Sequence, residues 1–138
     1  RRVGNIATSV ACVDDAVHAA REQRIPVVLF VQSELHPGCR DLIAELRADP
    51  QVLAALARRV VVAVVSVLDP AVSGLVAVRQ GPLTLPLLAC YDVADAAPWR
   101  LMAVMEAPAG AASVVKFVAH CDARWRRLRG EEVATTTW

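Results

Sequence analysis

Two short, unbroken apolar runs constrain the fold of this chain more than any other feature. Pro26–Gln32 and Val60–Val67 are almost entirely apolar and show no alternation with polar residues. Such a run is typical of a β-strand that is covered on both faces, as in the interior of a parallel sheet. The intervening residues 39–58 have helical spacing of apolar side chains, so they predict a right-handed βαβ crossover. The chain is therefore predicted to be an α/β protein.

Further helices and strands follow from local patterns along the chain. We predict helices over 13–24, 39–47, 51–58, 71–79 and 111–128, and strands over 26–32, 60–67, 86–92 and 99–106. A turn at Asp95–Pro98 separates the last two strands and makes them an antiparallel hairpin. The result is a mixed sheet of four to five strands with helices on both faces, in one domain over 13–129. Residues 1–12 are predicted to be a lead-in and residues 130–138 a flexible tail.

The composition narrows the classes of function. The chain has 138 residues and a net charge of +1, so bulk electrostatics give no support to a nucleic-acid partner. Its apolar runs fall short of the roughly 18 residues that a transmembrane helix needs, and no signal peptide is recognisable at the start of the sequence. The four cysteines, Cys12, Cys39, Cys90 and Cys121, form no CxxC pair. We therefore expect reduced thiols in a cytoplasmic protein.

Four local features resemble the thioredoxin fold over about residues 13–128. A buried strand leads into Glu34–Arg40, which reads ELHPGCR where thioredoxins read roughly EWCGPCK. Asp49–Val52, DPQV, is similar to the DPEV-like step of thioredoxin-like proteins with a broken active-site helix. Leu85-Pro86 precedes a strand, where this fold places a cis-proline, and a hairpin with a long amphipathic helix closes the chain. The resemblance implies a thioredoxin-like three-layer sandwich.

Within that superfamily the chain is most similar to the UAS domain of UBX-type ubiquitin-pathway adaptors. Those domains also open with a helix that ends near a Lys or Arg and continue into a P-x-L-V strand; the corresponding strand here begins PVVL at Pro26. They also carry polar residues in place of the redox cysteines. The resemblance implies a non-catalytic protein-interaction module, part of a ubiquitin or AAA-ATPase adaptor, with a protein as its partner.

The same resemblance implies which chemical groups are missing. His36 aligns with the first redox cysteine, Cys39 with the buried resolving cysteine, and Phe30 with the acidic residue that relays protons. Disulfide exchange needs an exposed thiolate and a second thiol close to it, so we expect no dithiol catalysis and no enzyme activity. One alternative is a monothiol oxidoreductase or thiol sensor that uses Cys39 with His36, because a helix N-terminus favours a thiolate. A structural subunit of a larger assembly is another alternative.

A peptide-binding groove is predicted beside the loop that precedes Cys39. If the Leu85-Pro86 bond is cis, its backbone faces this loop, where active relatives pair with an extended substrate peptide by strand addition. The competing interpretation is that Pro86 only shapes the loop. The predicted groove residues are Leu35, His36, Pro37, Leu85 and Pro86.

The end of the last predicted helix carries a cluster of arginines. Arg124, Arg126, Arg127 and Arg129 exceed what is needed to offset the helix dipole. We predict a basic patch for an anionic partner: an acidic protein, a lipid headgroup or a fatty-acid carboxylate. UAS domains are similar in carrying a basic patch linked to long-chain fatty acids. No metal site and no cofactor are expected, because neither His18 nor His120 has ligand spacing to His36.

Overall fold

The centre of the molecule is a mixed sheet of four strands. The computed structural model describes residues 13–75, 84–94 and 99–137. The strands are β1 (Val27–Gln32), β2 (Val61–Ser66), β3 (Leu87–Asp92) and β4 (Arg100–Glu106), in the order β2-β1-β3-β4. β1 pairs parallel with β2 and antiparallel with β3, and β3 pairs antiparallel with β4. The predicted mixed sheet with its final hairpin is confirmed, while the turn at Asp95–Pro98 lies outside the described residues.

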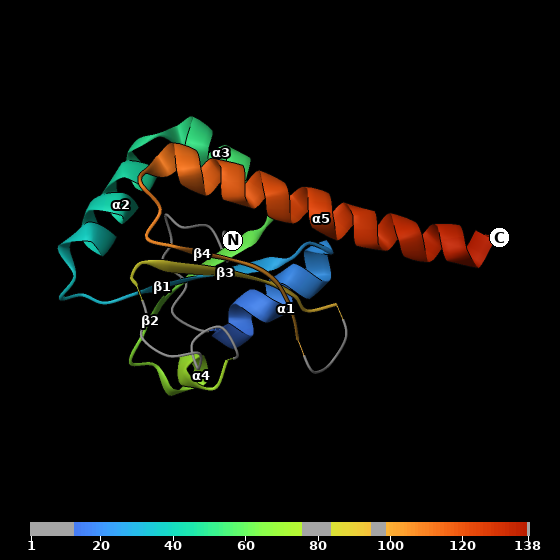
Figure 1. The fold of residues 1–138 in the computed structure, drawn as a ribbon, viewed down its shortest axis with the longest axis horizontal. Coiled ribbons are helices and arrows are strands. Elements are labelled where there is room, and N and C mark those ends of the chain that lie inside the picture. Colours follow the sequence, from blue (N-terminus) through green and yellow to red (C-terminus); the bar gives the residue numbers. More distant parts are fainter. Residues whose placement is uncertain (1–12, 76–83, 95–98, 138) are drawn as a thin grey trace.

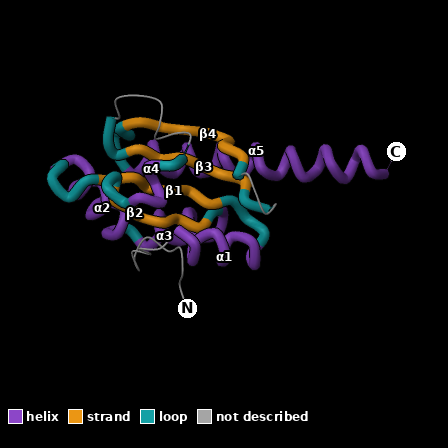
Figure 2. The backbone as a smooth tube through the Cα atoms, turned by 90° about the horizontal axis from the view of Figure 1, so that it is seen from below, coloured by secondary structure: helices purple, strands orange, loops and turns teal. Residues whose placement is uncertain are grey.

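Helices cover both faces of this sheet. They are α1 (Val13–Gln23), α2 (Pro37–Ala48), α3 (Pro50–Arg59), α4 (Pro70–Ser73) and α5 (Ala111–Thr137). Figure 1 shows α2, α3 and α5 on one side of the sheet and α1 and α4 on the other. Figure 2 shows the four strands from another direction, with helices on either side of them. The three layers predicted from the sequence are therefore present.

The two-sided burial of β1 explains why its sequence has no polar alternation. Val28 and Phe30 pack in the core cluster formed with α2, α3 and α5. Val27, Leu29 and Val31 pack in the second cluster, with α1 and α4. Since successive side chains of a strand point to opposite faces, a strand between two helical layers must be apolar at every position.

Two helices differ in length from the prediction. α4 is a single turn that ends at Ser73, with Gly74 as its C-cap, instead of a helix over 71–79; residues 76–79 lie outside the described part of the chain. α5 continues to Thr137, past residue 128 and into the segment predicted to be a flexible tail. No proline interrupts this segment, and Gly130 alone lowers its helix propensity by only about 1 kcal/mol. Figures 1 and 2 show the last turns of α5 extending past the sheet.

Candidate functional site

His36 is the N-cap of α2. Its backbone is extended, and its Nδ1 accepts a hydrogen bond from the backbone N–H of Cys39 at 3.3 Å. Pro37 occupies the first helical position, where a missing N–H has no cost. The helix therefore begins two residues before the predicted residue 39. An imidazole lone pair satisfies one of the N–H groups that a helix start leaves without a partner.

Cys39 lies in the first turn of α2 with its side chain turned inward. It is 0% exposed, as the resemblance implied. Nδ1 of His36 contacts the backbone N–H of Cys39. A base that activates a cysteine would instead hydrogen-bond to its thiol. A thiol without solvent access is slow to react with disulfides or peroxides. These observations favour a structural role for Cys39.

The other two described cysteines lie together elsewhere in the core. Cys90 of β3 and Cys121 of α5 belong to the same buried cluster. The hydrogen bond with the Cys121 thiol, together with burial, raises the pKa of Cys90 far above its usual value. Cys90 therefore stays a neutral thiol at physiological pH, and the three described cysteines are all free.

A cavity of about 300 Å³ opens beside His36. It is lined by His36, Gly38, Asp41, Leu42, Glu45, Leu85, Pro86, Ala107, Pro108 and Ala109. The Leu85-Pro86 bond is cis, as the resemblance implied. The fold thus brings the start of α2 and the cis-proline, which are far apart in the sequence, to the walls of one cavity. Of the predicted groove residues, His36, Leu85 and Pro86 line it, while Leu35 and Pro37 do not.

The turn between β4 and α5 forms a further wall of this cavity. Ala107 has a φ of 46°, a left-handed conformation that costs a residue with a Cβ about 1–2 kcal/mol. The N–H of Ala107 donates to the carbonyl oxygen of Pro86 at 2.8 Å, which holds the turn against the cis-proline. Backbone strain of this kind is concentrated at functional sites.

The acidic character of the cavity was not predicted from the sequence. Asp41 and Glu45 both line it from α2. Glu45 also accepts a hydrogen bond from the N–H of Ala111 at 3.0 Å and so caps the start of α5. Asp41 and Glu45 are four residues apart, so they lie on one face of a helix. That spacing is the signal in the sequence from which this wall could have been predicted.

The loops that follow β1 and β2 have the same local structure. Ser33 and Ser66 each accept, through Oγ, a hydrogen bond from the N–H of the leucine two residues later, Leu35 and Leu68. These leucines are 92% and 85% exposed. Because β1 and β2 are parallel neighbours with Gln32 opposite Ser66, both loops leave the sheet at the same end. Leu35 is therefore an exposed apolar residue of this end of the molecule, and it does not line the cavity.

Comparison with known proteins adds a fold assignment to this geometry. No family model matches the chain, and no curated protein matches it. Among solved structures, a thioredoxin from Thermus thermophilus superposes with a TM-score of 0.65 over 81% of this chain and 86% of its own, at 24% identity. The fold is thioredoxin-like. A disulphide isomerase from Xylella fastidiosa Temecula1 matches with a TM-score of 0.57 over 78% of this chain and 86% of that one, at 16% identity. Trxlp from Edwardsiella tarda EIB202 matches with 0.52 over 78% and 95%, at 19% identity.

The structural neighbours support the thioredoxin-like part of the resemblance and not its subtype. They are thioredoxins and a disulphide isomerase, and no UAS domain is among them. Phe30, which aligns with the proton-relay position of thioredoxins, is 1% exposed in the core beneath α2 and α3. The resemblance still aligns Phe30 and His36 with the proton-relay and first-cysteine positions of thioredoxins, and that alignment remains a prediction.

The four arginines of the predicted basic patch have different environments. Arg126 pairs with Asp122 at 3.1 Å, and Arg129 pairs with Asp92 at 2.6 Å. Arg124 and Arg127 are exposed. Since each helical residue is rotated by roughly 100° from the last, the four guanidinium groups are distributed around α5. Binding of an anionic partner to these four residues remains a prediction.

The remaining histidines take no part in the cavity. His18 pairs with Glu22 at 3.6 Å on the exposed face of α1. His120 is exposed on α5 beside the buried Cys121, so the two side chains face different directions. Within residues 13–75, 84–94 and 99–137, no group of three or more His, Cys, Asp or Glu side chains is placed to hold a metal ion. In the same part of the chain, no helix has the length and apolar character to cross a membrane.

Replacing His36 tests its role as a cap. The Cys39 N–H donates to the backbone carbonyl of His36 at 3.1 Å as well as to Nδ1 at 3.3 Å. His36→Ala removes the side-chain acceptor only, so the free energy of unfolding should fall by about 1 kcal/mol. His36→Asn keeps a side-chain acceptor at the N-cap and should lose less than half as much. Urea denaturation of the two variants measures the difference. Equal losses in both variants would contradict the capping role.

Proposed function

We propose that this thioredoxin-like domain is a non-catalytic interaction module that binds an extended segment of a partner protein in the cavity beside the cis Leu85-Pro86 bond. The observation that carries the proposal is the hydrogen bond from the Cys39 N–H to Nδ1 of His36. A capping imidazole thus stands at position 36, which the thioredoxin resemblance aligns with the first redox cysteine. The cavity is present beside His36, where the side chain is an imidazole and not the thiol that attacks a disulfide.

The chemistry of the residues supports binding over catalysis. A thiol–disulfide exchange step needs a thiolate that can reach the sulfur of its substrate. Cys39 is fully buried, and Cys90 and Cys121 lie in the core. A monothiol reaction would first require the buried thiol of Cys39 to become exposed. Nδ1 of His36 accepts from the backbone N–H of Cys39, an arrangement that does not activate the thiol. We therefore propose that the described part of the chain does not act as an enzyme.

The walls of the cavity define the chemistry of the partner segment. Leu85, Pro86 and Pro108 offer apolar surface. Asp41 and Glu45 add negative charge. A bound segment is therefore expected to combine apolar side chains with a Lys or Arg that reaches these carboxylates.

The adaptor role in a ubiquitin or AAA-ATPase pathway is the specific version of this proposal that the UAS resemblance adds. It is supported by the polar substitution at His36 and by the DPQV step at Asp49–Val52, which begins α3 with Asp49 as its N-cap. This version of the proposal names the partner of the cavity as a protein of the ubiquitin or AAA-ATPase pathway. Saturable binding of ubiquitin that the Ala109→Trp variant abolishes would support it.

Selection from a phage-displayed library of random linear peptides tests the proposal. Ala109 lines the cavity and Ala112 does not, and both are exposed. Peptides enriched on the wild type should carry a Lys or Arg next to apolar residues. Their affinity should fall at least about tenfold on Ala109→Trp, which fills the cavity, and stay unchanged on Ala112→Trp.

A matched pair of charge variants tests the acidic wall. Asp41→Arg should weaken the selected peptides, whereas Asp15→Arg on the distant α1 should not. Enriched peptides that bind Ala109→Trp as well as they bind the wild type would overturn the proposal. A library that yields no enrichment over the Ala109→Trp variant would do the same.

A further inference from the structure

The hydrogen bond at the N-cap of α2 can form in only one charge state of His36. Nδ1 of the ring accepts the N–H of Cys39 at 3.3 Å, so Nδ1 carries no proton. The proton of the neutral ring is therefore on Nε2. A protonated imidazole carries hydrogen on both nitrogens and has no lone pair with which to accept. Protonation of His36 therefore breaks this hydrogen bond.

A positive charge at this position also opposes the dipole of α2. The first turn of a helix presents N–H groups without partners and the positive end of the dipole. If the protonated ring stayed in place, its Nδ1–H would point at the N–H of Cys39, with one donor facing another. The ring of His36 is therefore expected to turn away from the start of α2 when it gains a proton.

The local structure lets the ring turn while the helix stays folded. The N–H of Cys39 also donates to the backbone carbonyl oxygen of His36 at 3.1 Å, so it keeps an acceptor when Nδ1 leaves. The ring lies against Gly38, where a Cβ would be 2.9 Å from Cε1 of His36. The cap thus depends on a close contact with a glycine, and the cavity of about 300 Å³ beside the ring offers space for a second position.

The charges on the cavity walls favour this second position. Asp41 and Glu45 line the same cavity as His36. Oε2 of Glu45 accepts from the N–H of Ala111 at 3.0 Å, whereas Asp41 has no hydrogen bond or ion pair with the described residues. The segment before β3 and the turn between β4 and α5 contribute only uncharged residues to the lining: Leu85, Pro86, Ala107, Pro108 and Ala109.

The other ionisable groups near position 36 do not line the cavity. Nη2 of Arg40 donates to the carbonyl oxygen of Glu34 at 3.4 Å, and both side chains are exposed. Glu106, at the end of β4, accepts a backbone N–H at 3.2 Å. The thiol of Cys39 is buried in the core. Among the described residues, the charged groups that share the cavity with His36 are therefore two carboxylates.

We propose that protonation of His36 closes the cavity to its partner. The imidazolium turns into the cavity and pairs with Asp41 and Glu45, the carboxylates that the Lys or Arg of a bound segment would contact. The neutral ring caps α2 and leaves these carboxylates open. This inference rests on the binding function proposed for the same cavity. It adds that the partner binds on the alkaline side of the range in which imidazoles change charge and is released on the acidic side.

NMR of the ¹⁵N-labelled whole chain tests the movement of the ring without a partner. Between about pH 8 and about pH 5.5 the Cys39 amide signal should shift with the same midpoint as the Cε1–H signal of His36. His36→Asn keeps a side-chain acceptor that does not titrate, so its Cys39 amide should not shift in this range. A wild-type Cys39 amide that stays unchanged while His36 titrates would overturn the proposal.

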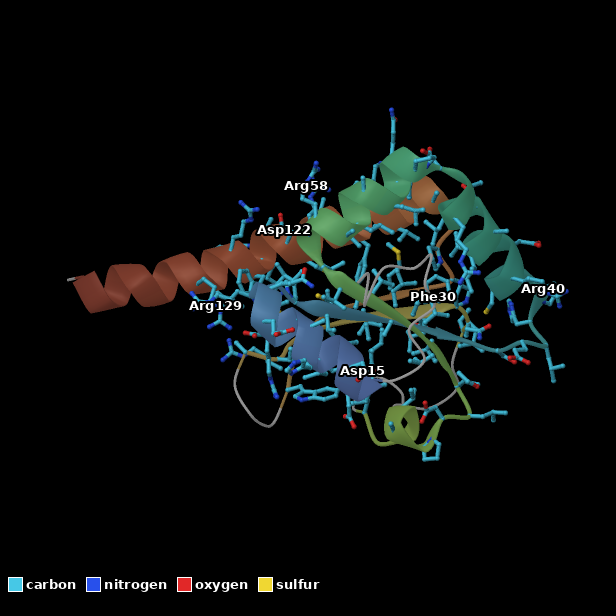
Figure 3. The ribbon with its side chains drawn as sticks, turned by 180° about the vertical axis from the view of Figure 1, so that it is seen from behind. Asp15, Phe30, Arg40, Arg58, Asp122 and Arg129 are labelled. Carbon is cyan, nitrogen blue, oxygen red and sulfur yellow. The ribbon has the colours of Figure 1, made fainter. Side chains whose placement is uncertain are left out.

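The affinity of the selected peptides tests the closure of the cavity. Wild-type affinity should fall at least about fivefold from about pH 8 to about pH 5.5, and that of His36→Asn less than about twofold. His36→Asn retains both carboxylates, so any effect of their own protonation remains in that variant. His18→Gln should behave as the wild type does, because His18 is on α1, on the other face of the sheet. Figure 3 shows α1, with Asp15, apart from the start of α2, with Arg40.

Two outcomes separate the switch from the binding function. The same loss of affinity on acidification in the wild type and in His36→Asn would overturn the switch and leave the binding function standing. A chain that enriches no peptide at any pH would contradict the binding function itself, and the closure of the cavity would fall with it.

Discussion

Arg129→Ala is expected to lower the free energy of unfolding by about 3 kcal/mol. The carboxylate of Asp92 is 7% exposed; its Oδ2 accepts from Arg129 at 2.6 Å and its Oδ1 from the N–H of Ala94 at 3.0 Å. Among the described residues, removing the guanidinium leaves a buried carboxylate with one hydrogen bond and no counter-charge. The cost is mainly that of an unpaired buried charge rather than the value of the ion pair itself.

The ion pair one turn earlier on α5 supplies the control. Arg126 pairs with Asp122 at 3.1 Å, but its side chain is 73% exposed. Arg126→Ala should therefore cost less than about 1 kcal/mol. The double variant Asp92→Asn/Arg129→Ala should be more stable than Arg129→Ala, because an amide needs no counter-charge. Urea denaturation of the three variants measures their free energies of unfolding. Equal losses of stability in Arg126→Ala and Arg129→Ala would contradict the burial argument.

The His36→Cys variant is expected to gain the dithiol chemistry that the wild type lacks. A sulfur at the N-cap would accept the Cys39 N–H in place of Nδ1, and a helix N-terminus favours the thiolate. Residues 36 and 39 are three apart at a helix start, a separation at which a disulfide fits. In a glutathione redox buffer the introduced thiol should form a disulfide with Cys39. With dithiothreitol as reductant, insulin reduction should rise at least about tenfold above the wild-type rate.

His36→Ser is the matched control, because serine caps a helix but brings no thiol. It should show neither the disulfide nor the turnover. Phe30 remains in place of a proton relay, so the gain in the His36→Cys variant should stay partial. If the introduced thiol stays reduced at every redox potential at which free dithiols oxidise, position 36 does not correspond to the redox cysteine of this fold.

The sheet was predictable because its strands are constrained on both faces. β1 lies between two helical layers, so Val27 to Val31 must all be apolar, and that run is visible in the sequence. The helix starts were also readable, since Asp49 and Asp69 each precede a proline at the first helical position. The length of α4 was not readable, because apolar residues continue beyond Gly74 while the helix stops there.

The candidate sites were predictable only in part. The resemblance placed His36 at the redox position, but it did not show that its Nδ1 accepts the Cys39 N–H, because a side-chain orientation is not encoded in an alignment. The acidic wall could have been found from the spacing of Asp41 and Glu45. A second cavity, with Arg21, Arg24 and Arg129 among its lining residues, could not have been found from sequence spacing. Residues 24 and 129 are far apart in the sequence and meet only in the folded chain.

The measurement that tests the central claim most directly is insulin reduction by the wild-type chain in the presence of dithiothreitol. With an imidazole at the helix cap and Cys39 fully buried, the rate should equal that of dithiothreitol alone. A wild-type acceleration that disappears in the Cys39→Ser variant would show that this sulfur reaches its substrate. The molecule would then be an oxidoreductase, and the binding account would be wrong.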